Sequence, residues 1–458
     1  MTEFTLQLEL DAATISEYER DFVLHSWTSQ ARYKSFVITG AKGCYFWDDQ
    51  GKRYLDFASQ LTNVNVGHQH PKILEAIKDQ VDKLCYVVPS ASNAQRARVA
   101  KMLAEIAPGD LNKTFFTSGG GEANENALKM ARAFTGRQKV IARFRSFHGG
   151  SYGVSSVMGD VRRIPSEPGV PGGLRVWDPF CYRCFFKMSY PQCNLYCAEA
   201  IRDTIEVEGP ESIAAIIVEP ITGSTCRIVA PDGYLERVRK ICDDYGILLI
   251  FDEVMTGFGR TGKWFAYEHW GVVPDIMTLS KGINNGTLPM GAVMVNNKVA
   301  EFFEDHILYA GLTQFGNPVV CSAAIATIEV MREEGLVENC RVQGEYLKER
   351  LEEIKAKHPS VGDVRGKGLF AAIELVKDRD SREPLVAWTV KNYENKDPLV
   401  SELLTKLKEE GLFTYSRWNV LFICPPLSIT REELSWGLDK IDQVLVIADD
   451  YVAKNFKQ

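Results

Sequence analysis

The chain has 458 residues, of which 45% are hydrophobic and 25% are charged, a balance typical of a globular protein large enough for more than one packed unit. Its net charge of −7 provides no basic field for a polyanion, so nucleic-acid binding is not expected. No apolar run approaches the roughly 20 residues that span a bilayer, and residues 1–21 lack the apolar core of a secretory signal. We therefore expect a soluble, cytoplasmic protein.

The first segment, residues 1–63, contains an alternating stretch at 43–59 (GCYFWDDQGKRYLDFAS). Apolar and polar side chains alternate on both sides of a DQG turn, which predicts a hairpin.

A glycine-rich turn follows the next predicted strand, residues 113–118 (KTFFTS). Gly119, Gly120 and Gly121 then open an alanine-rich helix. Because consecutive glycines leave backbone N–H groups unshielded at the positive end of a helix dipole, this turn can hold a phosphate. A glycine-rich turn alone is common, so its meaning depends on its neighbours.

Two further apolar runs end in residues suited to chemistry. Residues 139–153 (KVIARFRSFHGGSYG) carry Phe147 and His148, and residues 214–223 (AAIIVEPITG) carry Glu219. An aromatic ring at a strand end can stack on a planar cofactor, although a core phenylalanine is the plainer alternative.

Four cysteines lie between these runs, Cys181, Cys184, Cys193 and Cys197, in the pattern C-x2-C-x8-C-x3-C. The spacing resembles a zinc or iron-sulfur framework. Reduced cysteines are also common in cytosolic proteins, and the segment is rich in packing aromatics, so we predict no metal.

The most informative pair is Asp252, which closes a buried-strand pattern (ILLIFDEV), and Lys281, which follows another (DIMTLSKGINN). A lysine amine and a carboxylate at neighbouring strand ends are what pyridoxal phosphate requires. The amine forms a Schiff base, and the carboxylate keeps the pyridine nitrogen protonated. Because ligands of open α/β sheets bind beyond the carboxyl ends of strands, these groups can converge on one crevice.

Beyond residue 325, amphipathic stretches such as VQGEYLKERLEEIKAKH alternate with short apolar runs such as NVLFICPPL. This part predicts a smaller α+β unit, whereas the preceding part alternates strands and helices as a mostly parallel sheet requires.

Over nearly its whole length the chain resembles the class III aminotransferases, the ω-amino acid transaminases of pyridoxal-phosphate fold type I. The most specific stretches are SGGGEANENALKMAR, RSFHGG, VEPITG, FDEVMTGFGRTG, LSKGI and TQFGNPVV. The resemblance implies an α/β large domain (64–325) with a mostly parallel central sheet, and a smaller α+β domain formed by residues 1–63 and 326–458.

The resemblance also implies a role for each matching residue. Lys281 would be the cofactor lysine and proton shuttle, and Asp252 the partner of the pyridine nitrogen. Phe147 and Val254 would cover the two ring faces. The other implied cofactor contacts are His148 beside the ring, Glu219 near its substituents, and Gly120, Gly121 and Thr313 at the phosphate.

In similar enzymes the threonine equivalent to Thr313 reaches the phosphate of the neighbouring subunit, so a homodimer with shared active sites is implied. Many relatives have a hydroxyl residue where this chain has Gly119, Gly120 and Gly121. Backbone N–H groups must therefore carry more of the phosphate anchoring here.

Substrate binding is expected to involve Trp27 at the amine pocket and an arginine that clamps an anion. The candidates are Arg417, between strand-like segments, and Arg163, with Arg162 as its rival. The expected reaction moves an amino group from an ω-amino acid (taurine, β-alanine or 4-aminobutyrate) to 2-oxoglutarate or pyruvate. The alternatives are an aminomutase of the glutamate-1-semialdehyde type, a decarboxylase, a diamine or lysine transaminase, and a non-catalytic scaffold.

Overall fold

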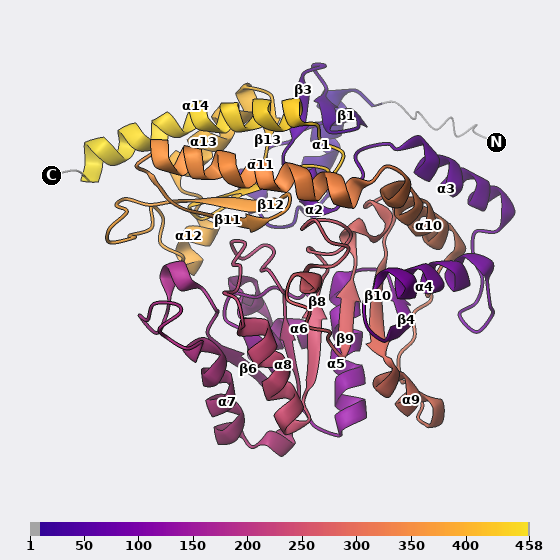
Figure 1. Ribbon diagram of the computed structural model, residues 1–458. Coiled ribbons are helices and arrows are strands. Elements are labelled where there is room, and N and C mark those ends of the chain that lie inside the picture. Colours follow the sequence, from indigo (N-terminus) through magenta and orange to yellow (C-terminus); the bar gives the residue numbers. More distant parts are fainter. Residues whose placement is uncertain (1–9, 457–458) are drawn as a thin grey trace.

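The computed structural model describes residues 10–456, so the first nine residues of the expected N-terminal segment lie outside the described part. Three sheets organise these residues, one of seven strands and two of four strands. Figure 1 shows the large sheet in the lower half, beneath a smaller unit that the long helices α11 and α14 cover. Within residues 10–456, no helix is long and apolar enough to cross a membrane.

The central sheet has the order β4-β10-β9-β8-β7-β5-β6. Its strands are β4 (Leu111–Thr117), β5 (Lys139–Arg143), β6 (Gly173–Val176), β7 (Ile213–Val218), β8 (Leu248–Asp252), β9 (Ile276–Leu279) and β10 (Gly291–Asn296). All neighbouring pairs from β6 to β9 are parallel, and β10 alone runs antiparallel to both its neighbours. The expected mostly parallel sheet is confirmed.

Alternate residues of the buried strands serve two different cores. On β8, Leu248 and Ile250 pack into the core beneath α5 (Gly120–Thr135), whereas Leu249 and Phe251 pack into the core on the opposite face. Because side chains alternate across a strand, the next residue, Asp252, points to the α5 face. The alternation along β8 therefore places the Asp252 carboxylate on the same side of the sheet as α5.

Helices cover both faces of the sheet, as a buried parallel sheet requires. On one face lie α5 and α6 (Tyr152–Val157), and on the other α7 (Tyr196–Glu208) and α8 (Tyr234–Tyr245). The remaining helices up to residue 333 are α1 (Ala12–Phe22), α2 (Ser59–Thr62), α3 (Pro71–Lys83), α4 (Ala94–Ile106), α9 (Asn297–Asp305) and α10 (Pro318–Glu333). The predicted boundary at residue 325 falls inside α10, which is continuous and packs on α3 and α4.

The smaller unit combines both ends of the described chain. One sheet has the order β1-β2-β3-β13 and the other β11-β12-β15-β14. The strands are β1 (Ile38–Lys42), β2 (Tyr45–Asp48), β3 (Arg53–Asp56), β11 (Val361–Lys367), β12 (Phe370–Leu375), β13 (Leu412–Phe413), β14 (Ser416–Arg417) and β15 (Val420–Ile423). The helices are α11 (Leu336–Lys357), α12 (Val390–Glu394), α13 (Pro398–Glu409) and α14 (Arg431–Phe456). The hairpin predicted at 43–59 is β2 and β3.

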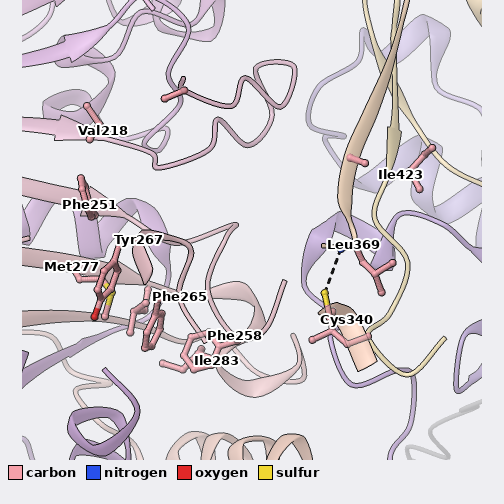
Figure 2. Close-up of a cluster of buried hydrophobic side chains, with 14 of the residues drawn as sticks. Val218, Phe251, Phe258, Phe265, Tyr267, Met277, Ile283, Cys340, Leu369 and Ile423 are labelled. Carbon is pink, nitrogen blue, oxygen red and sulfur yellow. Dashed lines mark hydrogen bonds between the residues drawn. The ribbon is translucent and has the colours of Figure 1, made fainter. Parts of the chain in front are cut away.

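One hydrophobic core runs from the large sheet into the smaller unit. Figure 2 shows Val218, Phe251 and Met277 from consecutive strands on one side and Leu369 with Cys340 on the other, where the Leu369 N–H donates to Cys340 Sγ. All five side chains are at most 1% exposed, and full burial of such an apolar side chain contributes about 1.5–3 kcal/mol. This packing holds the two units together around the crevice between them.

Candidate active site

A cavity of about 500 Å³ lies between the two units, at the carboxyl ends of the central strands. The large unit contributes the glycine turn, the loop after β5 and the ends of β7, β8 and β9. The smaller unit contributes residues of α12, α13 and β14. Ten of the residues expected at the site line it, and nine of them are Trp27, Gly120, Gly121, Phe147, His148, Glu219, Asp252, Val254 and Lys281. Arg417 lines it from the smaller unit.

Asp252 is held in a fixed orientation by three donors. Its Oδ1 accepts from the Val254 N–H (3.0 Å), and its Oδ2 accepts from Asn124 Nδ2 (2.8 Å) and lies 2.7 Å from His148 Nδ1. The side chain is 4% exposed. A buried carboxylate that is fully hydrogen-bonded in this way presents a stable negative charge to a cationic ring nitrogen.

Asn124 connects three of the strand ends, and sequence reasoning missed it. From the first turns of α5 it donates to Asp252 and to the His148 carbonyl (2.7 Å), and it accepts from Thr278 Oγ1 (2.6 Å). The alternation along the two strands places Thr278 and Asp252 on the side of α5, and Asn124 follows the glycine turn in the first turns of that helix. These two signals together could have identified Asn124 from the sequence.

Lys281 lies two residues after the end of β9, at the start of η6 (Lys281–Asn284), and adopts a left-handed backbone conformation (φ 47°), which is unfavourable for a side chain with a Cβ. Its Nζ donates to the Leu61 carbonyl (3.0 Å). Burial, together with the nearby charge of Arg227, lowers the pKa of Lys281 to about 8. A lysine amine with a lowered pKa is available as a nucleophile near neutral pH.

The glycine turn fits a phosphate and a flat ring. Helix α5 begins at Gly120, so the N–H groups of its first turn have no partner within the helix. A Cβ on Gly120 would lie 2.8 Å from Val254 Cγ1, and a Cβ on Gly149 would lie 2.7 Å from the Gly121 Cα. Glycine at these positions keeps the backbone accessible to an anion.

Glu219 closes the cavity wall beside Phe147. It accepts from the backbone N–H groups of Phe147 (3.2 Å) and Gly223 (2.6 Å). Burial raises the pKa of Glu219, and the charge of Asp252 adds to this effect. A raised pKa favours the neutral, protonated form of the Glu219 carboxyl over its ionised form.

Trp27, Phe147 and Arg162 form a stack at the cavity mouth. The Arg162 guanidinium lies 3.5 Å from the Phe147 ring centre and 4.9 Å from that of Trp27, and the two rings meet edge to face. Such cation–π contacts fix a guanidinium without neutralising it.

Arg162 and Arg417 share a single carboxylate. Asp160 Oδ1 accepts from Arg162 Nε (2.7 Å), and Asp160 Oδ2 accepts from Arg417 Nη2 (2.6 Å). Although burial opposes ionisation, the two guanidinium groups hold the pKa of Asp160 below its usual value. The cluster keeps a net positive charge at the cavity wall.

Two of the expected residues do not line this cavity. Arg163 forms an ion pair with Glu167 (3.0 Å) and donates to the Gly159 carbonyl (3.0 Å), so the structure brings its rival Arg162 to the site instead. Thr313 is exposed, in the segment between α9 and α10. Its predicted role involves the phosphate of a second subunit.

The four grouped cysteines line one small cavity away from this site, around η3 (Cys181–Arg183) and the start of α7. Burial raises the pKa of the Cys197 thiol to about 12 and also raises that of Cys181. Over residues 10–456, no group of three or more histidine, cysteine or acidic side chains is arranged to hold a metal ion.

The donor set fits pyridoxal phosphate. Backbone N–H groups at the start of α5 suit a dianion, the acid at the end of β8 suits a pyridinium, and Lys281 suits the aldehyde carbon. Phe147 and Val254 line the same cavity and supply apolar surface to it.

Comparisons with known proteins agree. Residues 28–445 match the family model described as aminotransferase class-III. A leucine/methionine racemase of Thermococcus litoralis is 36% identical, over 95% of this chain and 96% of its own length. A taurine–pyruvate aminotransferase of Bilophila wadsworthia is 33% identical, over 94% of this chain and 97% of its own length.

Among solved structures, a taurine:2-oxoglutarate aminotransferase from Bifidobacterium kashiwanohense, in complex with PLP and glutamate, has a TM-score of 0.92. It is 37% identical, over 97% of this chain and 99% of its own. The expected fold type I architecture is thereby confirmed. The chain belongs to the class III aminotransferases, and it is an enzyme that transfers an amino group from a donor to a 2-oxo acid with pyridoxal phosphate as its cofactor.

Proposed function

We propose that this aminotransferase takes the terminal amino group of an ω-amino acid whose far end is an anion, such as taurine, β-alanine or 4-aminobutyrate, and passes it to 2-oxoglutarate or pyruvate. The observation that carries the proposal is the cluster of two guanidinium groups around one carboxylate, Asp160. A substrate carboxylate or sulfonate would supply the second negative charge, and both anions match the fork of an arginine.

Each residue of the large unit has a proposed task. When bound, pyridoxal phosphate supplies an aldehyde carbon for an amine and a ring that withdraws electrons. Lys281 would hold that carbon and then carry the proton that leaves the donor carbon, since its lowered pKa of about 8 suits both directions of transfer. Asp252 would pair with the ring nitrogen, while Gly120 and Gly121 would bind the phosphate.

We also propose a homodimer in which Thr313 of each subunit reaches the phosphate in the other. The exposure of Thr313 and its absence from the cavity of its own chain support this arrangement. Light scattering of the purified protein measures the assembly. Thr313→Ala should weaken cofactor retention, and a monomeric enzyme that retains its cofactor would contradict the proposal.

A donor panel tests the substrate class. Taurine, β-alanine, 4-aminobutyrate, putrescine and lysine are each offered with pyruvate and with 2-oxoglutarate, and turnover is measured. Donors with an acidic far end should lead. Higher kcat/KM for putrescine than for every acidic donor would overturn the anion proposal and favour a diamine transaminase.

Two neighbouring arginines provide a matched pair of variants. Arg162→Ala removes a guanidinium that lines the cavity, whereas Arg163→Ala removes one that is bound to Glu167. Loss of a hydrogen bond to a charged group costs about 1.5–3 kcal/mol, so Arg162→Ala should raise KM for the acidic donor about 10- to 150-fold. Equal effects of the two substitutions would show that Arg162 does not bind the substrate.

The kinetic pattern distinguishes the other reactions of this cofactor. Transamination in two half-reactions gives parallel double-reciprocal plots for donor and acceptor. An aminomutase, a decarboxylase or a racemase would turn over its amino acid without any 2-oxo acid. Turnover that requires no acceptor would therefore contradict the proposal.

A further inference from the structure

Arg227 is a buried cation without an acidic partner. Its side chain is 0% exposed, and its guanidinium lies 3.7 Å from the Phe370 ring centre and 4.6 Å from that of Phe422. Within residues 10–456 no carboxylate forms an ion pair with it. Its partners are neutral: the Gly223 carbonyl (2.6 Å), Thr62 Oγ1 (3.4 Å) and Tyr415 Oη (3.4 Å).

This arrangement opposes stability. Burying a charge without a counter-charge costs several kcal/mol even after the protein relaxes, and the Arg227 Nε has no hydrogen-bond partner in the described structure. A flexible apolar side chain such as methionine could occupy much of the space between Phe370 and Phe422 without that cost. The retained charge therefore points to a role other than packing.

Two backbone segments with strained conformations connect Arg227 to Lys281. Cys226 (φ 81°) and Arg227 (φ 55°) are consecutive residues in left-handed conformations, and Ser59, Gln60 and Thr62 (φ 46°, 54° and 60°) form a second such group. Each costs on the order of 1–3 kcal/mol, and such strain is concentrated at functional sites. Arg227 meets the second group at Thr62.

The same short segment contacts the lysine. The carbonyl of Leu61, next to Thr62 in the chain, accepts from Lys281 Nζ (3.0 Å). Arg227 and Lys281 are thus connected through two adjacent residues, Thr62 and Leu61, of one strained segment.

Four charged or ionisable groups act on the Lys281 amine. Arg227 and, more weakly, Arg162 oppose its protonation, while Asp252 and Cys424 favour it. Apart from burial, Arg227 is the largest of these influences. Asp252, the acid at the end of β8, is therefore not the only group that influences the charge of the Lys281 amine.

We infer that Arg227 is a positioning residue: its buried charge repels the like charge of a protonated Lys281 amine, and the segment that it contacts at Thr62 orients that amine through the Leu61 carbonyl. The inference depends on the proposed role of Lys281. The alternative is that Arg227 only links Gly223, Thr62 and Tyr415 mechanically.

The test titrates Lys281 in the full-length protein after removal of the cofactor. The rate of acylation of Lys281 by acetic anhydride is followed against pH by peptide mass spectrometry. Arg227→Gln should shift the midpoint upward by about one pH unit, the order expected for the removal of one nearby charge at an effective dielectric of about 20. Arg227→Lys, which keeps the charge, should retain the midpoint of the parent protein.

Thr62→Val is the matched control, because it removes one contact of Arg227 in nearly the same volume and keeps the charge. Its midpoint should not move, although its thermal stability should fall. The inference is overturned if Arg227→Gln leaves the midpoint unchanged, or if Arg227→Lys or Thr62→Val shifts it as far. Arg227→Met provides the same comparison if the glutamine variant does not fold.

The proposed role of Lys281 is checked separately. Borohydride reduction of the parent protein with its cofactor should attach the cofactor mass to the peptide that contains Lys281. If the cofactor mass is not attached to that peptide, the role of Lys281 is rejected. If the acylation midpoint of Arg227→Gln equals that of the parent protein, only the role of Arg227 is rejected.

Discussion

Replacing Asp252 by asparagine tests the electrostatic centre of the site. The buried carboxylate accepts from Val254, Asn124 and His148, and asparagine has nearly the same shape but no charge and only one accepting oxygen. Because both oxygens of Asp252 accept hydrogen bonds, the NH2 group of the asparagine would have to face another hydrogen-bond donor. We expect the variant to fold and to bind the cofactor. It should no longer stabilise the negative charge that develops when the proton is removed from the donor.

The size of the effect follows from the kind of contact that is lost. Removing one preorganised electrostatic contact to a transition state costs about 2.7–4 kcal/mol, or 100- to 1000-fold in kcat. Mixing the pyridoxal form rapidly with donor alone, and following the cofactor absorbance, isolates this half-reaction. The rate constant should fall by that factor while donor affinity changes little.

Asp275→Asn is the matched control. Asp275 precedes β9 at the other end of the strands, where it forms an ion pair with Arg239 (2.8 Å) and accepts from the Leu249 N–H (2.8 Å). Its substitution should lower stability and leave the half-reaction unchanged. If Asp252→Asn lowers the rate constant by less than about tenfold with cofactor bound, Asp252 is not the partner of the ring nitrogen.

Three further predictions concern the same region. Lys281→Ala should abolish turnover but still bind the cofactor without a covalent link, and equilibrium dialysis that finds no binding would contradict this. Gly120→Ala should weaken cofactor binding at least tenfold, since its Cβ would lie 2.8 Å from Val254 Cγ1, and an unchanged Kd would show that the turn can move. Glu253 is fully buried, and burial raises its pKa from 4.5 to about 7. Its folded form thus holds a proton that the unfolded form releases, so its contribution to stability is lost as pH rises from about 4.5 to 7, by about 3 kcal/mol. Glu253→Gln should remove this loss, and urea unfolding curves in which both proteins lose equal stability between pH 5 and 7.5 would refute it.

Local pattern was enough to predict the strands and which polar residues lie at their ends. The buried run before Asp252 and the glycines before α5 each identify a strand end or a helix start without any partner. The contacts of Asp160 and Asn124 required the folded chain, because Arg417 lies 257 residues from Asp160 and Asp252 lies 128 residues from Asn124.

The choice between Arg162 and Arg163 shows the limit of sequence spacing. Both lie in the 3₁₀ helix η2 (Val161–Ser166), where successive side chains point about 120° apart. One residue of difference in where that helix begins would exchange the two arginines. In the folded chain the Arg162 N–H donates to Asp160 Oδ1 (2.9 Å), which caps the helix and fixes where it begins.

The pairing of β13 with β3 has a consequence for the order in which the chain can fold. Leu412 pairs with Leu55, 357 residues (412 − 55) earlier in the chain. During synthesis the β2–β3 hairpin therefore emerges with an open edge, and its partner follows only after the whole central sheet has been made. An exposed strand edge is a template for pairing with other chains. Truncation before residue 412 leaves that edge permanently uncovered, so aggregation, more than loss of the cofactor site, should limit the yield of shortened forms.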